Sequence, residues 1–590
     1  MRRGSTPLSL GSRLICCSTQ DGPRGASEPP ESSEPSSSLP PEAAQGLQQQ
    51  PALAAAEPPQ RASASPKASL LALLAGFSNT NAEWLRSRRR KRWWKRRVFP
   101  RVPFAKRAPP AQPLAPGSAA SLDGALLRKA APLAVMFFCA SFNLCLLSAS
   151  KDALIVTAPG GGVEVIPFLM TYGVLPLSLL FTLCYSQLVE RLPARLVFYA
   201  ACLPLLAFYA CFAFLLHPHA QQLHPHVLAD ALAAALPAGF SGLVGALRNW
   251  TFSLFFCAAE LWGGVVISLL FWSLANEVCT VSEAKVVYPL LGIAANVALV
   301  AAGGVLRALN TLPGVEAGAT LRLTVLAVLG GAVALFAAKA HVDRRLGPQQ
   351  AAPRKRKKAA LSAAQQLSAL AASPKIRALA VLVVSYGLCH RLFEVAWKGQ
   401  LRALHPDPGA YAAALGDVST LTGAASIAMM LAARYIFQYA GWGVAAAATP
   451  VAMLLAGGGF FVASLAARAG GGTPALLAAA AAAGAVTQVC ARTLKYSLFD
   501  PAKEMVFIGL NKEEKTQGKA TVDLLGSQVG KSGASLTMQA LLLCCGSLGA
   551  SLPVMGAVFG AMVILWLNSV RQLNGTLLRE SEASARTAAV

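Results

Sequence analysis

The chain is 590 residues long, with 55% hydrophobic and only 13% charged residues. So apolar a composition over this length excludes an ordinary water-soluble protein and predicts an integral membrane protein. The formal net charge is +25, from 52 Lys and Arg against 27 Asp and Glu. The 13 cysteines form no CxxC motif and no His/Cys spacing typical of a metal site, so we predict neither a disulfide framework nor a metal centre.

Residues 1–120 differ from the rest of the chain. Pro, Ser, Ala and Gln dominate, as in Ser36–Pro41, and such a composition cannot bury enough apolar surface to fold. We therefore expect a disordered N-terminal region. Its Ser-rich run and its basic segment Arg86–Arg97 favour a plastid transit peptide, whereas acids such as Asp21 and Glu28 leave a plain disordered tail as the alternative.

From about residue 127, apolar stretches long enough to cross a bilayer alternate with short polar loops. We expect about twelve membrane spans, near 131–150, 163–186, 195–216, 250–276, 286–308, 321–340, 377–397, 417–438, 443–467, 474–498, 520–548 and 553–570. This pattern predicts an all-α membrane protein with a major-facilitator-like architecture. Its parts would be a six-helix bundle at 127–345, a basic linker at 346–374, a second six-helix bundle at 375–572 and a polar tail at 573–590.

The basic segments fall on one side of this layout. The N-terminal region, Arg354–Lys358 in the linker and Lys512–Lys519 would all lie on the side that the positive-inside rule assigns to the cytoplasm, or to the stroma of a plastid. Basic runs beside membrane spans favour contacts with anionic lipids over nucleic acid. We therefore expect membrane lipids as partners and no nucleic acid.

A carboxylate stands inside the fourth predicted span. The stretch Trp250–Trp272 is apolar and long enough to cross a membrane, yet it contains Glu260. A charge at membrane depth is costly, so its default interpretation is a substrate, ion or proton site. The simpler alternative is a carboxylate that packs between helices or stays protonated.

Lys151 follows the first predicted span, and two interpretations stay open. It is either a lysine at a helix end that reaches the membrane surface, or the helix continues through Ala153–Val156 and Lys151 points into a central cavity. In the second case the Pro159–Gly162 turn closes the helix.

The seventh predicted span carries a further charged group. Arg391, Glu394 and Lys398 fall at i, i+3 and i+7, on one helix face. A local ion pair is the alternative to a transport role. Lys495 stands at the end of the tenth span, and we expect the following segment 496–502 to be a solvated loop.

Lys531 lies among Gly and Ser residues in the eleventh predicted span. The stretch Gly526–Ser532 has three residues between its glycines where a phosphate-binding P-loop has four, so we do not expect a membrane ATPase. A lysine among small residues within an apolar helix instead favours a cationic contact for phosphate. Arg248 and Asn296 are further polar candidates for substrate contacts, and the His-rich segment 216–226 is expected to be a flexible connection.

The candidate residues thus combine carboxylates and lysines in both halves. Opposite charges let an empty cavity neutralise itself, which lowers the cost of burying each charge. A polyanion can then displace the carboxylates and bind the lysines.

At this point the sequence resembles a known family, the ATP/ADP translocases of plastids and obligate intracellular bacteria. The matching stretches are Lys151–Gly160, Ala259–Gly263, Phe271–Asn276, Glu283–Lys285, Gly292–Val297, Glu394–Lys398, Lys495–Met505 and Gly530–Gly533. They occur in order through roughly residues 127–572, while the N-terminal region is not covered. The stretch Leu147–Ser150 and the long loop 217–247 depart from the family pattern.

The resemblance implies a secondary transporter rather than an enzyme, without a cofactor. It implies exchange of cytosolic ATP for plastid ADP, with phosphate in some members, across the plastid inner envelope. It also implies that Lys151, Glu260, Glu394 and Lys531 correspond to charged transport residues of the family. The alternatives are a proton-coupled nucleotide symporter, a broader nucleotide carrier, or a membrane scaffold that transports nothing. We further expect a monomer.

Overall fold

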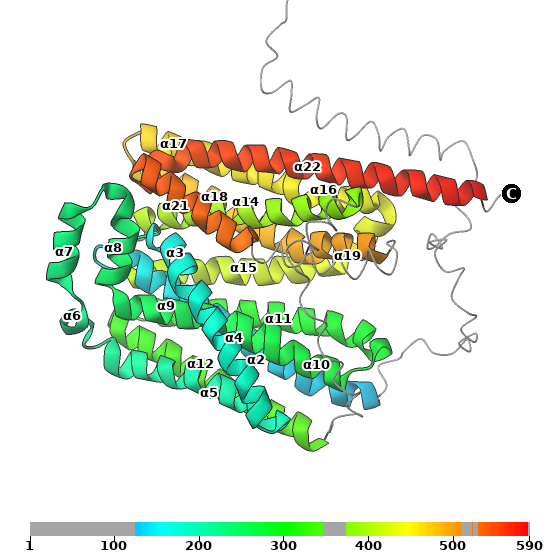
Figure 1. Cartoon of the computed structure of the whole chain (residues 1–590), viewed down its shortest axis with the longest axis horizontal. Helices are drawn as coiled ribbons and strands as arrows, with labels where there is room; N and C mark the ends of the chain where they lie inside the picture. The colour runs from blue at the N-terminus through cyan, green and yellow to red at the C-terminus, as the bar shows by residue number, and fades with distance from the viewer. Residues whose placement is uncertain (1–123, 346–372, 509–521, 523–528, 588–590) are drawn as a thin grey trace, which may run out of the picture. The chain divides into compact units, whose positions relative to one another are not determined.

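The computed structural model describes residues 124–345, 373–508, 522 and 529–587 (Figure 1). These residues belong to one compact unit, residues 96–590. Within the described ranges the regular structure is entirely helical. The predicted disordered region, residues 346–372 of the basic linker predicted at 346–374, and Lys512–Lys519 lie outside the described residues.

The first half of the membrane region is built from helices that precede the linker. They are α2 (Gly124–Thr157), α3 (Val165–Phe168), η2 (Leu169–Val174), α4 (Leu175–Arg191), α5 (Ala194–Cys211), η3 (Phe212–Leu216), α6 (Ala220–Leu223), α7 (His226–Ala235), η4 (Ala238–Phe240), α8 (Ser241–Arg248), α9 (Trp250–Trp262), η5 (Gly263–Phe271), α10 (Trp272–Val278), α11 (Val281–Asn310) and α12 (Ala317–Arg345).

The second half follows the linker. Its helices are α14 (Pro374–Leu404), α15 (Pro408–Tyr435), η6 (Ile436–Ala440), α16 (Trp442–Ala452), η7 (Met453–Gly457), α17 (Gly458–Ala469), α18 (Pro474–Leu494), η8 (Lys495–Phe499), α19 (Asp500–Ile508), η9 (Val529–Gly533), α21 (Ala534–Cys545) and α22 (Leu548–Thr587). The last helix therefore continues into the segment that we expected as a polar tail.

Eleven helices of the described chain are long and apolar enough to cross a membrane. This number and the helical content confirm the predicted all-α membrane class. The remaining predicted span, near 520–548, lies partly outside the described residues, and its described part includes η9 and α21. Helices suit this environment because the hydrocarbon core offers no partner for a free backbone N–H or C=O group.

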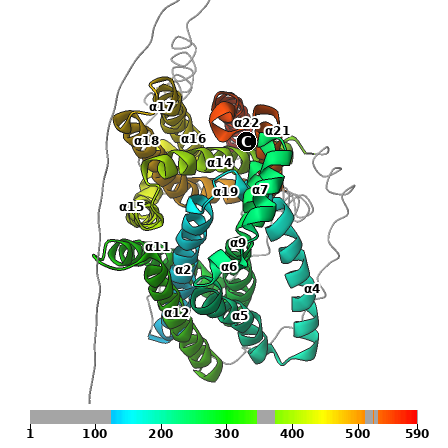
Figure 2. The same cartoon turned by 90° about the vertical axis from the view of Figure 1, so that its left-hand side faces the viewer.

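The helices pack as two groups that meet along two seams. In the first half α2 packs against α9, α11 and α12, and in the second α14 packs against α18 and α22. The first seam joins α11 to α15, which lie side by side in Figure 2. The second seam joins α21 to α3 and η4.

We call the end of the bundle where α12 ends and α14 begins the linker side, and the opposite end the far side. Polar contacts join the two halves at the far side. Arg402 of α14 donates to the carbonyl of Gly161, just after α2, at 3.0 Å. The amide of Gln539 on α21 donates to the carbonyl of Pro167 at 3.0 Å and to the hydroxyl of Thr171 at 2.8 Å.

Two sequence predictions about loops are wrong. The segment 496–502 is helical, because η8 and α19 continue the tenth span and bury Ser497, Leu498 and Phe499. The His-rich segment 216–226 is not a simple flexible connection. It contains α6 and enters α7, and the buried His224 ring bonds the Thr251 hydroxyl at 2.7 Å.

Candidate charged site between the halves

Seven charged side chains from four helices form one contiguous cluster between the two halves. Their helices are α2, α9, α14 and α18. The cluster comprises Lys151, Asp152, Glu260, Arg391, Glu394, Lys398 and Arg492.

Lys151 organises the first-half part of the cluster. Helix α2 continues past it to Thr157, as the second interpretation of the sequence expects, and the lysine is buried. Its ammonium group lies 3.0 Å from Asp152 Oδ1 and 3.4 Å from Glu260 Oε2. It also lies 4.0 Å from the centre of the Phe256 ring, a cation–π arrangement. Glu260 thus has a cationic partner that explains how a carboxylate is tolerated in this span.

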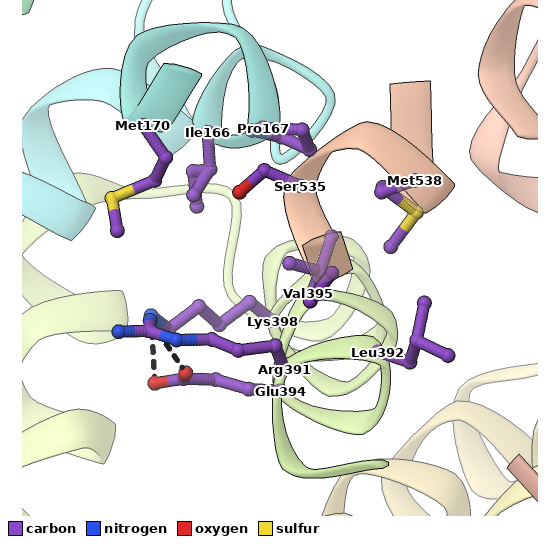
Figure 3. Close-up of a pocket in the computed structure, with 11 residues that line it drawn as sticks. Ile166, Pro167, Met170, Arg391, Leu392, Glu394, Val395, Lys398, Ser535 and Met538 are labelled. Carbon is purple, nitrogen blue, oxygen red and sulfur yellow. Dashed lines mark hydrogen bonds and ion pairs between the residues drawn. The ribbon is translucent and has the colours of Figure 1, made fainter. Parts of the chain in front are cut away.

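Glu394 organises the second-half part. Its Oε2 accepts from Arg391 at 3.1 Å, and its Oε1 lies 3.2 Å from Lys398 (Figure 3). The same Oε1 lies 3.4 Å from Arg492. The i, i+3 and i+7 spacing predicted that the three α14 residues share a face, and these contacts confirm it. Arg492 adds a cation from α18, which packs against α14.

Two ion pairs within the cluster join the halves. Lys398 of α14 lies 2.9 Å from Asp152 Oδ2 of α2. Arg391 of α14 lies 3.8 Å from Glu260 Oε1 of α9. In both pairs the first half supplies the carboxylate and the second half supplies the cation.

The cluster contains four cations and three carboxylates, so one positive charge is in excess. It borders a pocket whose lining includes Arg391, Glu394 and Lys398 together with Met170 and Ser535 (Figure 3). Paired charges are cheaper to bury than single ones, and each cation regains its affinity for another anion once its carboxylate is displaced. The arrangement can accept a ligand that carries several negative charges.

Only some of the predicted site residues lie in the cluster, namely Lys151, Glu260 and Glu394. Lys495 lies on η8, which continues from the α18 helix of Arg492. Its ammonium group is 2.9 Å from Asp500 and 5.5 Å from the centre of the Tyr386 ring. The backbone of Lys531 is in η9, which packs against α14, while its side chain lies outside the described residues.

Arg248 and Asn296 lie elsewhere. Arg248 pairs with Asp230 in the short helices before α9 and packs over Gly160. Asn296 of α11 donates to the carbonyl of Gly292 at 2.8 Å and faces Met430 of α15, so it belongs to the first seam. A role for either residue in substrate contact stays a prediction.

Sequence reasoning missed Asp152 and Arg492 as members of the site. Asp152 follows Lys151 directly, beyond the predicted span that ended at residue 150, and the sequence left open whether the helix continued through it. Arg492 stands near the end of the tenth predicted span, where a basic residue is ordinary. A signal was available for Asp152, because the same helix extension that turns Lys151 inward also buries its neighbour.

Within the described ranges, His, Cys, Asp and Glu side chains form no group that could hold a metal ion.

An all-helical membrane fold with a charged site shared by two halves defines a membrane carrier for a charged solute.

The sequence profile of the TLC ATP/ADP transporter family matches residues 121–577. The chain belongs to this family. That membership confirms the predicted family and identifies a secondary transporter rather than an enzyme.

Three relatives illustrate the range of the similarity. The chloroplastic ADP,ATP carrier protein 2 of Arabidopsis thaliana is 40% identical over 470 residues, covering 77% of this chain and 76% of the relative. The plastidic ATP/ADP-transporter of Solanum tuberosum is 40% identical over 469 residues, covering 77% and 74%. The ADP,ATP carrier protein 1 of Chlamydia muridarum is 38% identical over 475 residues, covering 78% and 90%.

Proposed function

We propose that this chain is an ATP/ADP antiporter that works by alternating access. The observation that carries the proposal is the charged cluster, which both halves build and which has an excess of positive charge. Membership of an ATP/ADP transporter family and relatives named as ADP,ATP carriers support this choice of substrate.

In this proposal the cations bind phosphate oxygens through charge-assisted hydrogen bonds. Lys151 and Lys531 are the lysines that we assign to this task, and Arg391 and Lys398 are further cations for it. Glu260 and Glu394 hold the cations in the empty carrier and release them when a nucleotide binds. Lys495 is a further candidate contact at the edge of the site.

We place the transporter in the inner envelope of a plastid, where it would bring in cytosolic ATP and release ADP. The chloroplastic relatives and the composition of residues 1–120 support this location. ATP and ADP differ by about one negative charge. A one-for-one exchange therefore moves charge across the membrane unless phosphate or a proton accompanies it. A single chain supplies both halves of the site, which supports a monomer as the transporting unit.

The test is exchange in proteoliposomes. Vesicles that contain the purified protein are loaded with ADP, and labelled ATP is added outside. We expect uptake into loaded vesicles well above uptake into vesicles without internal nucleotide, and a strong reduction in Lys151→Gln. Equal uptake with and without internal ADP, abolished by a proton uncoupler, would instead identify a proton-coupled nucleotide importer. A lack of uptake under both conditions would refute nucleotide transport.

A further inference from the structure

Asp152 has no task in nucleotide binding, because phosphate does not bind a carboxylate. The side chain is nevertheless buried in the middle of the cluster. Its Oδ1 lies 3.0 Å from Lys151 of its own helix, and its Oδ2 lies 2.9 Å from Lys398 of the other half. One carboxylate therefore connects a cation of each half.

The Asp152–Lys398 pair differs from the ion pair that joins the halves along the first seam. The two side chains are only 5% and 6% exposed. In the Arg307–Asp417 pair, between α11 and α15, the side chains are 61% and 41% exposed. Water can replace either partner of the exposed pair at little cost, whereas separating the buried pair takes one ion-pair partner from each charge: Asp152 keeps only Lys151, and Lys398 must share Glu394 with Arg391 and Arg492.

The position of the pair connects it to closure of the far side. Asp152 and Lys398 lie within the last two turns of α2, which ends at Thr157, and of α14, which ends at Leu404. Just beyond them Arg402 contacts Gly161, where the halves are closed. Opening the far side moves these two helix ends apart and breaks the pair.

A bound nucleotide changes the cost of this step. A phosphate oxygen can take the place of Asp152 beside Lys398, while Lys151 stays next to Asp152 on the same helix. The loaded carrier can then separate α2 from α14 while Lys398 keeps a second anionic partner beside Glu394. The empty carrier has no such replacement.

We propose that the Asp152–Lys398 ion pair is a lock that stops the empty carrier from changing the side to which it opens. Asp152 acts by holding Lys398 and not by contacting the nucleotide. Because the empty carrier stays locked, exchange becomes obligatory. The inference rests on the ATP/ADP exchange proposed above, since only a carrier whose empty form cannot reorient must return with a counter-substrate. Asp152→Asn removes the charge, keeps the shape and lets the empty carrier reorient.

The experiment separates net efflux from exchange. Proteoliposomes are preloaded with labelled ATP, with the membrane potential clamped by potassium and valinomycin, and efflux is followed with and without external ADP. For the wild type and for Asp417→Asn, the matched control on the exposed cross-half pair, we expect efflux only with external ADP. For Asp152→Asn we expect efflux without external nucleotide that is at least about tenfold faster than in the wild type, because the buried pair no longer has to be broken. Asp152→Glu, which keeps the carboxylate, should remain coupled.

The outcomes distinguish this inference from the proposed function. A wild type that does not exchange refutes the proposed function itself. A wild type that exchanges, together with an Asp152→Asn variant that exchanges but shows no net efflux above the wild type, overturns the lock alone. If Asp152→Asn does not fold, Asp152→Ser takes its place. The lock is likewise overturned if no folded variant without the carboxylate shows net efflux.

Discussion

At the scale of single residues, Glu394 is the carboxylate that pairs with the three cations that the second half supplies to the cluster. It lies within ion-pair distance of Arg391, Lys398 and Arg492, and its side chain is only 7% exposed. A carboxylate in this position competes with phosphate for the same cations. Removing its charge therefore strengthens nucleotide binding and leaves the empty site with uncompensated positive charge.

We accordingly predict that Glu394→Gln lowers both kinetic constants of exchange. The KM for ATP should fall and the maximal exchange rate should fall, each by roughly tenfold, which corresponds to about 1.4 kcal/mol. The measurement is the dependence of exchange on external ATP in ADP-loaded proteoliposomes. Glu190→Gln, on the exposed face of α4, should change neither constant. An unchanged KM in Glu394→Gln would show that this carboxylate does not compete with the nucleotide.

The same residues show how far sequence reasoning reaches. Glu260 and Glu394 were predictable as site residues, because a charge in an apolar span is expensive and needs a reason. Their partners were not predictable. Whether Lys151 pairs with Glu260, or Lys398 with Asp152, depends on how α2, α9 and α14 are rotated against one another, and an apolar sequence leaves that rotation open.

At the scale of elements, α11 begins with a complete capping box outside the membrane span. The Glu283 carboxylate accepts from the backbone N–H of Thr280 at 2.8 Å, and the Thr280 hydroxyl accepts from the N–H of Glu283 at 3.4 Å. Lys129 of α2 donates to the same carboxylate at 2.9 Å. The N–H of Thr280, and after it Lys129, lower the pKa of Glu283 below its ordinary value.

This capping box predicts a pH-dependent effect of Glu283→Gln on stability. Because the pKa is lowered in the folded state, the carboxylate stabilises the fold above its unfolded pKa of about 4.3. This contribution is lost as the pH falls through the folded-state pKa. The variant should be less stable at pH 7 by about 1 kcal/mol, typical of a lost cap, and the difference should shrink below pH ~4. Thermal unfolding in detergent across this pH range measures it. The exposed Glu277→Gln should show no such trend, and a difference that stays constant with pH would contradict the assignment.

The first seam depends on close approach of α11 and α15. A Cβ atom at Gly303 would lie 2.2 Å from the Thr420 hydroxyl and 2.3 Å from the Gly416 carbonyl, so the two helices must separate to accept it. The next residue, Gly304, has nothing within 4 Å of such an atom. Gly303→Ala should therefore destabilise the protein by about 1–3 kcal/mol, as overpacking does. Gly304→Ala should be neutral or stabilising, because Ala favours a helix over Gly. Equal thermal stability of the two variants would rule out the close seam.

The segment 496–502, which the sequence predicted as a loop, is helical for reasons of tertiary context. The segment is polar and contains Pro501, yet it continues the helix of the tenth span, with the π-helical turn η8 just before the proline. The Tyr386, Phe499 and Trp566 rings pack together around this point and hold the continuation inside the bundle. Such packing partners come from distant parts of the chain and leave no local signal.

At the scale of the whole molecule, composition and span spacing were sufficient to predict an all-helical membrane transporter. They did not indicate at which end the halves would touch. In the structure the polar contacts Arg402–Gly161 and Gln539–Pro167 close the far side. On the linker side, the described helix α4 has no buried residue, and its Leu179, Leu180 and Leu183 are more than half exposed.

Gln539 offers a direct test of this closure. Its amide donates to the Pro167 carbonyl and to the Thr171 hydroxyl, both in the other half, so Gln539→Leu removes two hydrogen bonds between α21 and the segment after α2. The buried carbonyl and hydroxyl then lose their partner, at a cost of about 1–3 kcal/mol. Residues 158–168 should consequently exchange their amide hydrogens at least about tenfold faster in the variant.

The control lies on the same helix. The hydroxyl of Thr537 donates to the carbonyl of Gly533 within its own chain segment, at 2.8 Å, and does not cross between the halves. Thr537→Val therefore removes a hydrogen bond of similar length without loosening the far side, and exchange of residues 158–168 should stay at the wild-type rate. If both variants protect this segment equally, Gln539 does not hold the halves together, and closure of the far side must depend on Arg402 and on the ion pairs beneath it.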